Sequence, residues 1–180
     1  MRTTDYPNLD KMFIERRSPY AFSQEELDVE EVKTLFEAAR WSPSSYNEQP
    51  WRFIYAQNAN DLETFNNVLM EPNQAWASKA PLLILVFTKK HFSQNGKVNP
   101  WAQFDAGAAT MALILQAHKR GLHAHVMGGF YADKAFEVSG MNNDEYEAIA
   151  AIAVGKADES IEQELSQRND ISEFVFENRV

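Results

Sequence analysis

The spacing of hydrophobic and polar residues predicts that helices and strands alternate along the chain. The clearest helix starts after Asp28, which can cap its N-terminus, and Glu31 three residues later completes a capping-box pattern. Pro43 ends this helix. Its buried face is predicted from apolar residues at helical spacing, namely Val32, Leu35, Phe36 and Ala39.

Three further helical stretches follow from the same periodicity. A short one precedes Pro19 and carries Leu9, Met12 and Phe13. Asn60 and Glu63 form another capping pair, ahead of a helix with Leu62, Phe65 and Leu69 on one side. The longest helix is expected over residues 104–120, with Gly121 at its C-cap.

Strands are predicted over residues 51–56, 82–87, 122–127 and 149–154, where β-branched, aromatic and other apolar residues run together. The second is apolar on both faces, which indicates a central strand covered on two sides. Because helices and strands do not alternate in strict βαβ order, we expect an α+β fold with a mixed central sheet between helical layers.

Composition restricts the class of protein. The chain has 180 residues and is 44% hydrophobic, so we expect one core and a single domain over residues 1–180. Its formal net charge of −9 disfavours broad nucleic-acid binding. The absence of cysteine excludes disulfides, thiolate chemistry and sulfur-ligated zinc, and favours a cytoplasmic location. No signal peptide or membrane-spanning run is expected, since the longest apolar run covers only residues 82–87.

The C-terminal tail, residues 160–180, is polar at first and then carries four large apolar side chains. Those side chains need a surface to cover them, and a partner subunit is one candidate. The residues concerned are Ile171, Phe174, Val175 and Phe176.

Three segments could bind a ligand. Arg16-Arg17-Ser18 offers two guanidinium forks and a hydroxyl, which suits a phosphate, although paired arginines are more often solvated. The segment 42–51 is rigid and rich in uncharged donors and acceptors, which suits a heteroaromatic ring, although an ordinary polar turn is the common alternative. Gly128-Gly129 follows a strand, so its backbone could approach a flat ligand or simply form a flexible turn.

Several other chemistries are disfavoured. His123 and His125 share one face of a predicted strand, but no third residue has suitable spacing, so we expect no metal site. A hydrolase is disfavoured because no Gly-x-Ser-x-Gly nucleophile elbow occurs. Gly-x-Gly-x-x-Gly and Walker sequences are also missing, so a nicotinamide would bind only transiently.

In this order along the chain, the three segments resemble the FMN-dependent nitroreductase family. The resemblance extends from Arg16 to Arg168, and its most specific part runs from Pro43 to Phe53. The other matching pieces are Asp105-Ala106-Gly107, Gly121-Leu122, Gly128-Gly129-Phe130 and Val154-Gly155-Lys156.

The resemblance implies a three-layer α/β/α sandwich in an interlocked homodimer, with two FMN sites at the subunit interface. NAD(P)H would donate hydride through flavin N5 in a ping-pong reaction, with nitroaromatics or quinones as acceptors. No side chain is expected to act as an acid or a base, because the cofactor carries the difficult step. Two alternatives stay open: a relative that dehalogenates, dehydrogenates or breaks down flavin, or a flavin-binding storage or sensing protein.

Site residues follow from the resemblance position by position. Arg16, Arg17, Ser18 and Arg168 match the residues that face the flavin phosphate, and Asn73 matches the asparagine at the pyrimidine edge. Gly128 and Gly129 match the backbone near flavin N5. The partner subunit would contribute the segment that carries Pro43, Ser44, Ser45, Asn47 and Gln49, and Lys156 belongs to the last matching motif.

Two positions depart from the family pattern. Tyr20 and Trp76 stand where many relatives carry a cation near the flavin. Since positive charge there stabilises the reduced flavin, we hypothesise a more negative reduction potential than in cation-rich relatives, unless Arg17 or Arg52 substitutes. Trp101 and Phe104 could line the mouth of the cleft or belong to the core.

Overall fold

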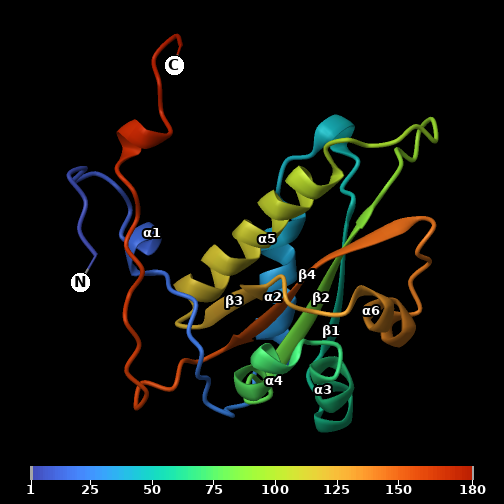
Figure 1. The fold of residues 1–180 in the computed structure, drawn as a ribbon, viewed down its shortest axis with the longest axis horizontal. Helices are drawn as coiled ribbons and strands as arrows, with labels where there is room; N and C mark the ends of the chain where they lie inside the picture. The colour runs from blue at the N-terminus through green and yellow to red at the C-terminus, as the bar shows by residue number, and fades with distance from the viewer. Residues whose placement is uncertain (1, 180) are drawn as a thin grey trace.

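The structure, a computed structural model, describes residues 2–179. Its elements follow the order α1 (Met12–Glu15), α2 (Val29–Arg40), η1 (Ser45–Asn47), β1 (Trp51–Ala56), α3 (Ala59–Asn66), α4 (Glu71–Ala77), β2 (Leu82–Lys89), α5 (Ala102–Lys119), β3 (His123–Met127), α6 (Ala132–Ser139), β4 (Tyr146–Gly155) and η2 (Ile171–Glu173). Figure 1 shows their arrangement.

The helices with strong local signals lie where they were predicted. The side chain of Asp28 accepts a hydrogen bond of 2.8 Å from the Glu31 backbone N–H, as the capping pattern required. Helix α5 starts two residues before the predicted Phe104, and Gly121 follows its C-cap with φ +76°.

Other helical boundaries were wrong. The N-cap of α3 is Asn58, whose side chain accepts from the Asp61 N–H, and not Asn60. Leu69 lies outside α3, and Leu9 lies outside α1, which has only four residues. Helices α4 and α6 were not predicted because each is short, with seven and eight residues, and neither has a side-chain cap.

The sheet has the order β1-β2-β4-β3, and every pairing in it is antiparallel. Within residues 2–179 the expectation of a mixed sheet is therefore wrong, because alternation of helices and strands does not encode strand direction. The prediction of a central strand is confirmed, since β2 lies between two strands and all its residues but Lys89 are buried.

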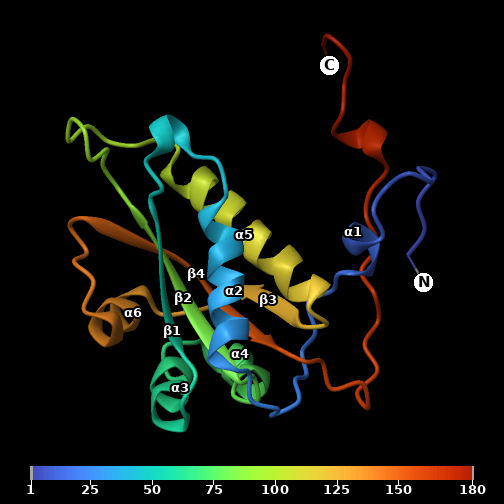
Figure 2. The ribbon, with the colours of Figure 1, turned by 180° about the vertical axis from the view of Figure 1, so that it is seen from behind.

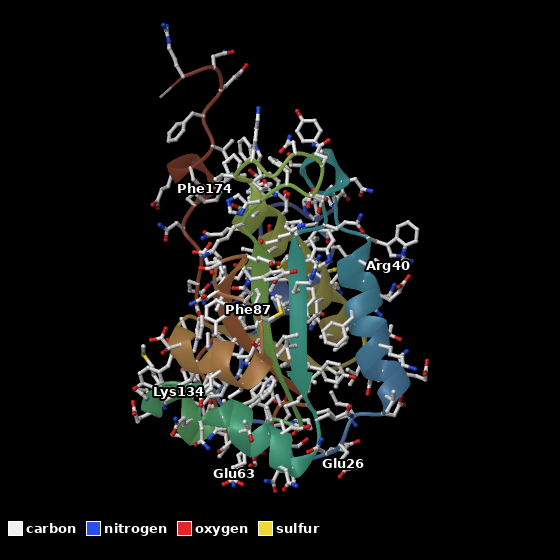
Figure 3. All side chains as sticks on the ribbon, turned by 90° about the vertical axis from the view of Figure 1, so that its right-hand side faces the viewer. Glu26, Arg40, Glu63, Phe87, Lys134 and Phe174 are labelled. Atoms are coloured by element: carbon white, nitrogen blue, oxygen red, sulfur yellow. The ribbon has the colours of Figure 1, made fainter. Side chains whose placement is uncertain are left out.

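Helices cover both faces of this sheet, which confirms the three-layer α/β/α sandwich (Figures 1 and 2). Helices α2 and α5 pack on one face, where Leu35 and Leu113 meet Ile84 and Ile152 of the sheet. Helices α3, α4 and α6 cover the other, and Phe87, labelled in Figure 3, is fully buried there. The order of the sheet leaves β3 as an edge strand.

The two ends of the chain lie side by side and away from the sheet, as both ribbon views show. The tail does not reach the core of its own chain, and the side chain of Phe174 is 65% exposed at its end (Figure 3). The expected docking of the tail on a partner subunit stays a prediction. Along residues 2–179, every helix is too short or too polar to cross a lipid bilayer.

Candidate functional site

Residues from three separate segments meet along the edge strand β3. At the start of the strand, Arg17 Nε donates a hydrogen bond of 3.1 Å to His123 Nε2. In the middle, the rings of Tyr20 and Trp76 pack against His125, with centroids 4.6 and 4.5 Å away. Beyond the end, Asn73 contacts Gly129.

Main-chain contacts hold the N-terminal segment in this position. His125 Nδ1 lies 2.9 Å from the carbonyl oxygen of Pro19, which can only accept, so this nitrogen carries the proton. Phe22 forms a β-bridge with Ala157, just after β4, and is buried. The segment that follows Arg16 is therefore fixed against the last strand and the edge strand together.

The predicted phosphate residues form two groups. Arg16 Nη1 donates to Ser18 Oγ over 3.4 Å. Burial, followed by the charges of Arg168 and Arg2, lowers the pKa of Arg16, so both of those arginines lie within electrostatic range of it. Arg17 is separate, because it forms an ion pair with Glu159 while it donates to His123.

His123 belongs to the site, although sequence reasoning considered it only as a metal ligand. Burial, followed by the charge of Arg17, lowers its pKa to about 4, so the ring is neutral at pH 7. Its Nε2 accepts from Arg17, so Nδ1 carries the proton, and this buried atom has no partner among the described residues. The alternation of His123 and His125 on one face was the available signal.

Aromatic rings occupy positions 20 and 76, the two positions that depart from the expected family pattern. Tyr20 packs edge-on against Trp76, with centroids 5.3 Å apart. Burial lowers the pKa of the neighbouring His125, so this imidazole also contributes no positive charge at pH 7. The middle of the site is therefore apolar and uncharged, and suits a flat ring.

Asn73 and Gly129 form the far end of the site. Asn73 Nδ2 donates to the Gly129 carbonyl oxygen over 2.9 Å, and the N–H of Met70 donates to the same oxygen over 3.0 Å. A Cβ at position 129 would lie 2.7 Å from Asn73 Nδ2, so a larger residue there would displace this amide. A Cβ on Gly128 would contact nothing within 4 Å, so this backbone has open space beside it.

The Pro43–Gln49 segment has a strained backbone. Tyr46, Asn47 and Gln49 all have positive φ, between 50° and 56°, a region that non-glycine residues seldom adopt. The N–H of Ser45 donates to Asp105 Oδ2 over 3.0 Å, and the N–H of Gln49 donates to Ser44 Oγ over 3.0 Å. Pro43, Ser44, Ser45, Asn47 and Gln49 are thus held together in one loop.

Glu48 fixes this loop to the turn that follows β2. Its carboxylate accepts from both the backbone N–H and the hydroxyl of Ser93, at 2.9 and 2.5 Å. Lys89 Nζ lies 3.7 Å away, and the Glu48 side chain is only 7% exposed. Burial alone would raise the pKa of Glu48, but the bonds from Ser93 and the charge of Lys89 outweigh it and lower that pKa.

The two halves of the predicted site lie at opposite ends of α5. Ser45 bonds to Asp105 in the first turn, whereas His118 in the last turn lies 6.2 Å from the ring of His123. At 1.5 Å per residue, positions 105 and 118 are about 20 Å apart along the helix. Within one chain, the structure therefore does not bring the Pro43–Gln49 segment together with Arg17 and Asn73.

Three remaining residues have a clear environment. Lys156 Nζ forms a 2.6 Å ion pair with Glu25, and both side chains are about half exposed, so Lys156 is directed to the surface. Trp101 and Phe104 are 56% and 75% exposed, which overturns a core role.

Comparison with known proteins gives consistent matches. The model of the nitroreductase family matches residues 14–75 and 68–156. A crystal structure of an oxidoreductase containing FMN is 37% identical, with a TM-score of 0.92, and the match covers 99% of this chain and 95% of that one. A nitroreductase family protein from Streptococcus pneumoniae superimposes with a TM-score of 0.79 at 21% identity, over 93% and 98% of the two chains.

The name of one relative points to the same family. The Ralstonia nicotianae protein named "Putative NADH dehydrogenase/NAD(P)H nitroreductase" is 24% identical in an alignment of 152 positions that covers 74% of this chain and 78% of the relative. Since the family model matches residues 14–156 in two overlapping parts and the architecture agrees, the chain belongs to the nitroreductase family.

Proposed function

We propose that the protein is an FMN-dependent oxidoreductase that takes hydride from NAD(P)H and passes it to nitroaromatic, quinone or similar acceptors. The observation that carries the proposal is the chemistry along β3: guanidinium groups at one end, aromatic rings in the middle, and an amide beside open glycine backbone at the other. This order matches the phosphate, the ring system and the reactive edge of one FMN.

The residues fit that cofactor. Arg16, Ser18 and Arg168 would hold the phosphate, with Arg17 beside it. A neutral, apolar middle would accept the ring, and Asn73 would face its pyrimidine edge while the Gly128 backbone has room for close approach. Among residues 2–179, the positively charged side chains of the site lie at one end only. A ligand with a single anionic group requires this distribution of charge.

Bound FMN would supply the hydride-accepting and hydride-donating centre. The protein's own residues would bind and orient it, and no side chain is assigned a proton-transfer role. The nicotinamide and the acceptor would occupy the same open face in turn, which is a ping-pong scheme. Because NAD(P)H is the proposed donor, the proposal places the enzyme in the cytoplasm.

The separation of the two site halves supports a homodimer. If the Pro43–Gln49 segment takes part in the same site, a second copy must supply it, because about 20 Å of α5 separates the halves within one chain. The tail, residues 160–180, has exposed apolar side chains that a partner subunit would cover. In this proposal residues 1–180 form one FMN-binding domain, and the dimer is interlocked through the tail.

The first experiment is the visible absorption spectrum of the purified protein, with identification of the cofactor that heating releases. We expect flavin bands and FMN at about one per chain. A colourless protein that takes up no added FMN would overturn the proposal. Steady NAD(P)H oxidation with a nitro compound or quinone then distinguishes an enzyme from a flavin-storage or sensing protein.

Sedimentation analysis tests the dimer. Phe174→Asp, at a side chain 65% exposed, costs little in a monomer but should dissociate a dimer that buries the tail. Val29→Asp, at a side chain 56% exposed on α2, is the matched control. A wild-type monomer that retains FMN would overturn the shared site.

A further inference from the structure

Arg2 connects the two ends of the chain at the phosphate side of the site. Its Nη1 donates to the carbonyl oxygens of Ile14 and Arg16, at 3.2 and 2.5 Å. Its Nε donates to the carbonyl oxygen of Ser166 at 2.8 Å. One side chain therefore binds both the segment that carries Arg16 and the segment that carries Arg168.

Arg2 and Arg168 share an acceptor. Arg168 Nη1 donates to the Ser166 carbonyl oxygen at 3.4 Å and to that of Gln167 at 2.9 Å. Arg2 thus has one contact with the main chain of Arg16 and another with the oxygen that Arg168 also uses. Without Arg2, few polar contacts among the described residues hold the late part of the tail against the N-terminal segment.

Arg2, Arg16 and Arg168 have no ion-pair partner among residues 2–179. Among residues 2–179, no carboxylate lies within 4.0 Å of Arg2, Arg16 or Arg168, whereas Arg17 is paired with Glu159. Burial first, and then repulsion from Arg168 and Arg2, lowers the pKa of Arg16. In a chain of net charge −9, three arginines without an ion pair favour an anionic ligand.

Space for such a ligand lies next to Arg2. The residue lines two grooves, of about 410 and 570 Å³. Arg168 lines the first groove and Arg17 lines the second. The Nη2 of Arg2 donates no hydrogen bond to residues 2–179, so it stays available to an anion.

We propose that Arg2 is a positioning residue of the phosphate site, which holds Arg16 and Arg168 together and adds a third positive charge to the group that binds a phosphate monoester. This inference rests on the proposed function and deepens it. It assigns a role in phosphate affinity to Arg2, which lies outside residues 14–156, the segment that the family model matches.

The test compares FMN with riboflavin, which has the same ring system but no phosphate. Flavin fluorescence quenching on the apoprotein measures both affinities. For Arg2→Ala we expect the Kd for FMN to rise about tenfold or more, with the Kd for riboflavin changed less than about twofold. The dependence of FMN affinity on salt concentration should also become weaker.

Two further variants make the result specific. Arg2→Lys keeps the charge but loses the fork that reaches three carbonyl oxygens, so its FMN affinity should lie between wild type and Arg2→Ala. Lys33→Ala removes one positive charge from the exposed surface of α2 and should leave both affinities unchanged.

Each outcome has a distinct meaning. Equal weakening of FMN and riboflavin would show that Arg2 supports the fold and not the phosphate site, and would overturn the inference, as would unchanged FMN affinity in Arg2→Ala. If Arg2→Ala fails to fold, the Arg2→Lys comparison of the two ligands decides. Wild-type protein that binds neither ligand would instead contradict the proposed function.

Discussion

The side-chain amide of Asn73 donates a hydrogen bond of 2.9 Å to the carbonyl oxygen of Gly129, 56 residues further along the chain. This bond joins α4, which had no clear sequence signal, to the turn that follows the edge strand. It leaves Asn73 Oδ1 as an acceptor, and the bonded Gly129 is one residue along the chain from the open backbone of Gly128. The geometry of this end of the site therefore depends on the Asn73 amide and on the absence of a Cβ at Gly129.

Gly129→Ala should weaken flavin binding by displacing Asn73. The new Cβ would lie 2.7 Å from Asn73 Nδ2, so the amide must move and its hydrogen bond is lost. We expect the free energy of unfolding of the apoprotein to fall by about 1–3 kcal/mol. Chemical denaturation and flavin titration measure the two effects.

Gly128→Ala is the matched control, because its Cβ would contact nothing within 4 Å and the apoprotein should keep its stability. Since this backbone is proposed to face the flavin, the same variant should still weaken flavin binding. Full flavin affinity in Gly128→Ala would remove Gly128 from the site.

His123 should make the stability of the protein depend on pH. Its pKa is about 4 in the folded chain and about 6.5 when unfolded, so between these values the unfolded chain binds more protons. The free energy of unfolding should therefore rise with pH through this window and level off above it. Because the ring is only partly buried, we expect about 1–2 kcal/mol.

His123→Gln keeps an acceptor for Arg17 but cannot titrate. We expect urea denaturation from pH 5 to 7 to give a steeper rise of the free energy of unfolding with pH in the wild type than in this variant, which keeps only the contribution of His125. Parallel curves for the two proteins would mean that His123 has the same pKa folded and unfolded.

Glu48 should stabilise the strained loop at residues 46–49. Glu48→Ala removes the acceptor for both Ser93 bonds and leaves Lys89 without its partner. We expect a loss of about 1–3 kcal/mol in the free energy of unfolding, together with weaker FMN affinity. Glu48→Gln, which retains one acceptor oxygen, should recover part of the lost stability and part of the lost FMN affinity.

Glu63→Ala is the control for Glu48→Ala, because it also removes an acidic side chain, here an exposed one on α3 (Figure 3). If Glu48→Ala were no less stable than Glu63→Ala, the loop would hold its conformation without the carboxylate.

Tyr20→Lys should raise the reduction potential of bound flavin. The site offers aromatic rings and a neutral imidazole around Tyr20, and Arg17 is bound to His123 and Glu159. Arg52 Nη1 donates to the carbonyl oxygens of Gln49 and Trp51, so within one chain it lies with the Pro43–Gln49 half of the site and not beside Tyr20. A new ammonium group near the ring would favour the reduced, anionic form.

Spectroelectrochemistry measures the potential directly, with Tyr20→Phe as the control that keeps the ring. An unchanged potential in Tyr20→Lys would contradict the hypothesis that missing positive charge sets the potential of this protein.

Local patterns in the sequence were sufficient for much of the fold. The capping pair at Asp28 and the apolar run at residues 82–87 predicted α2 and β2, because each depends on neighbours within a few residues. The resemblance carried by the segment at Pro43 and by Arg16-Arg17-Ser18 predicted the family, and the comparison confirmed it.

Only the tertiary structure decided the direction of the strands and the edge position of β3, which no local pattern encodes. It also decided that His123 meets Arg17 and that Asn73 meets Gly129, since these contacts join residues 106 and 56 positions apart. The separation of the two site halves along α5 has the same origin. Hydrophobic periodicity determines which face of an element is buried, whereas the packing of distant elements determines which polar side chains meet.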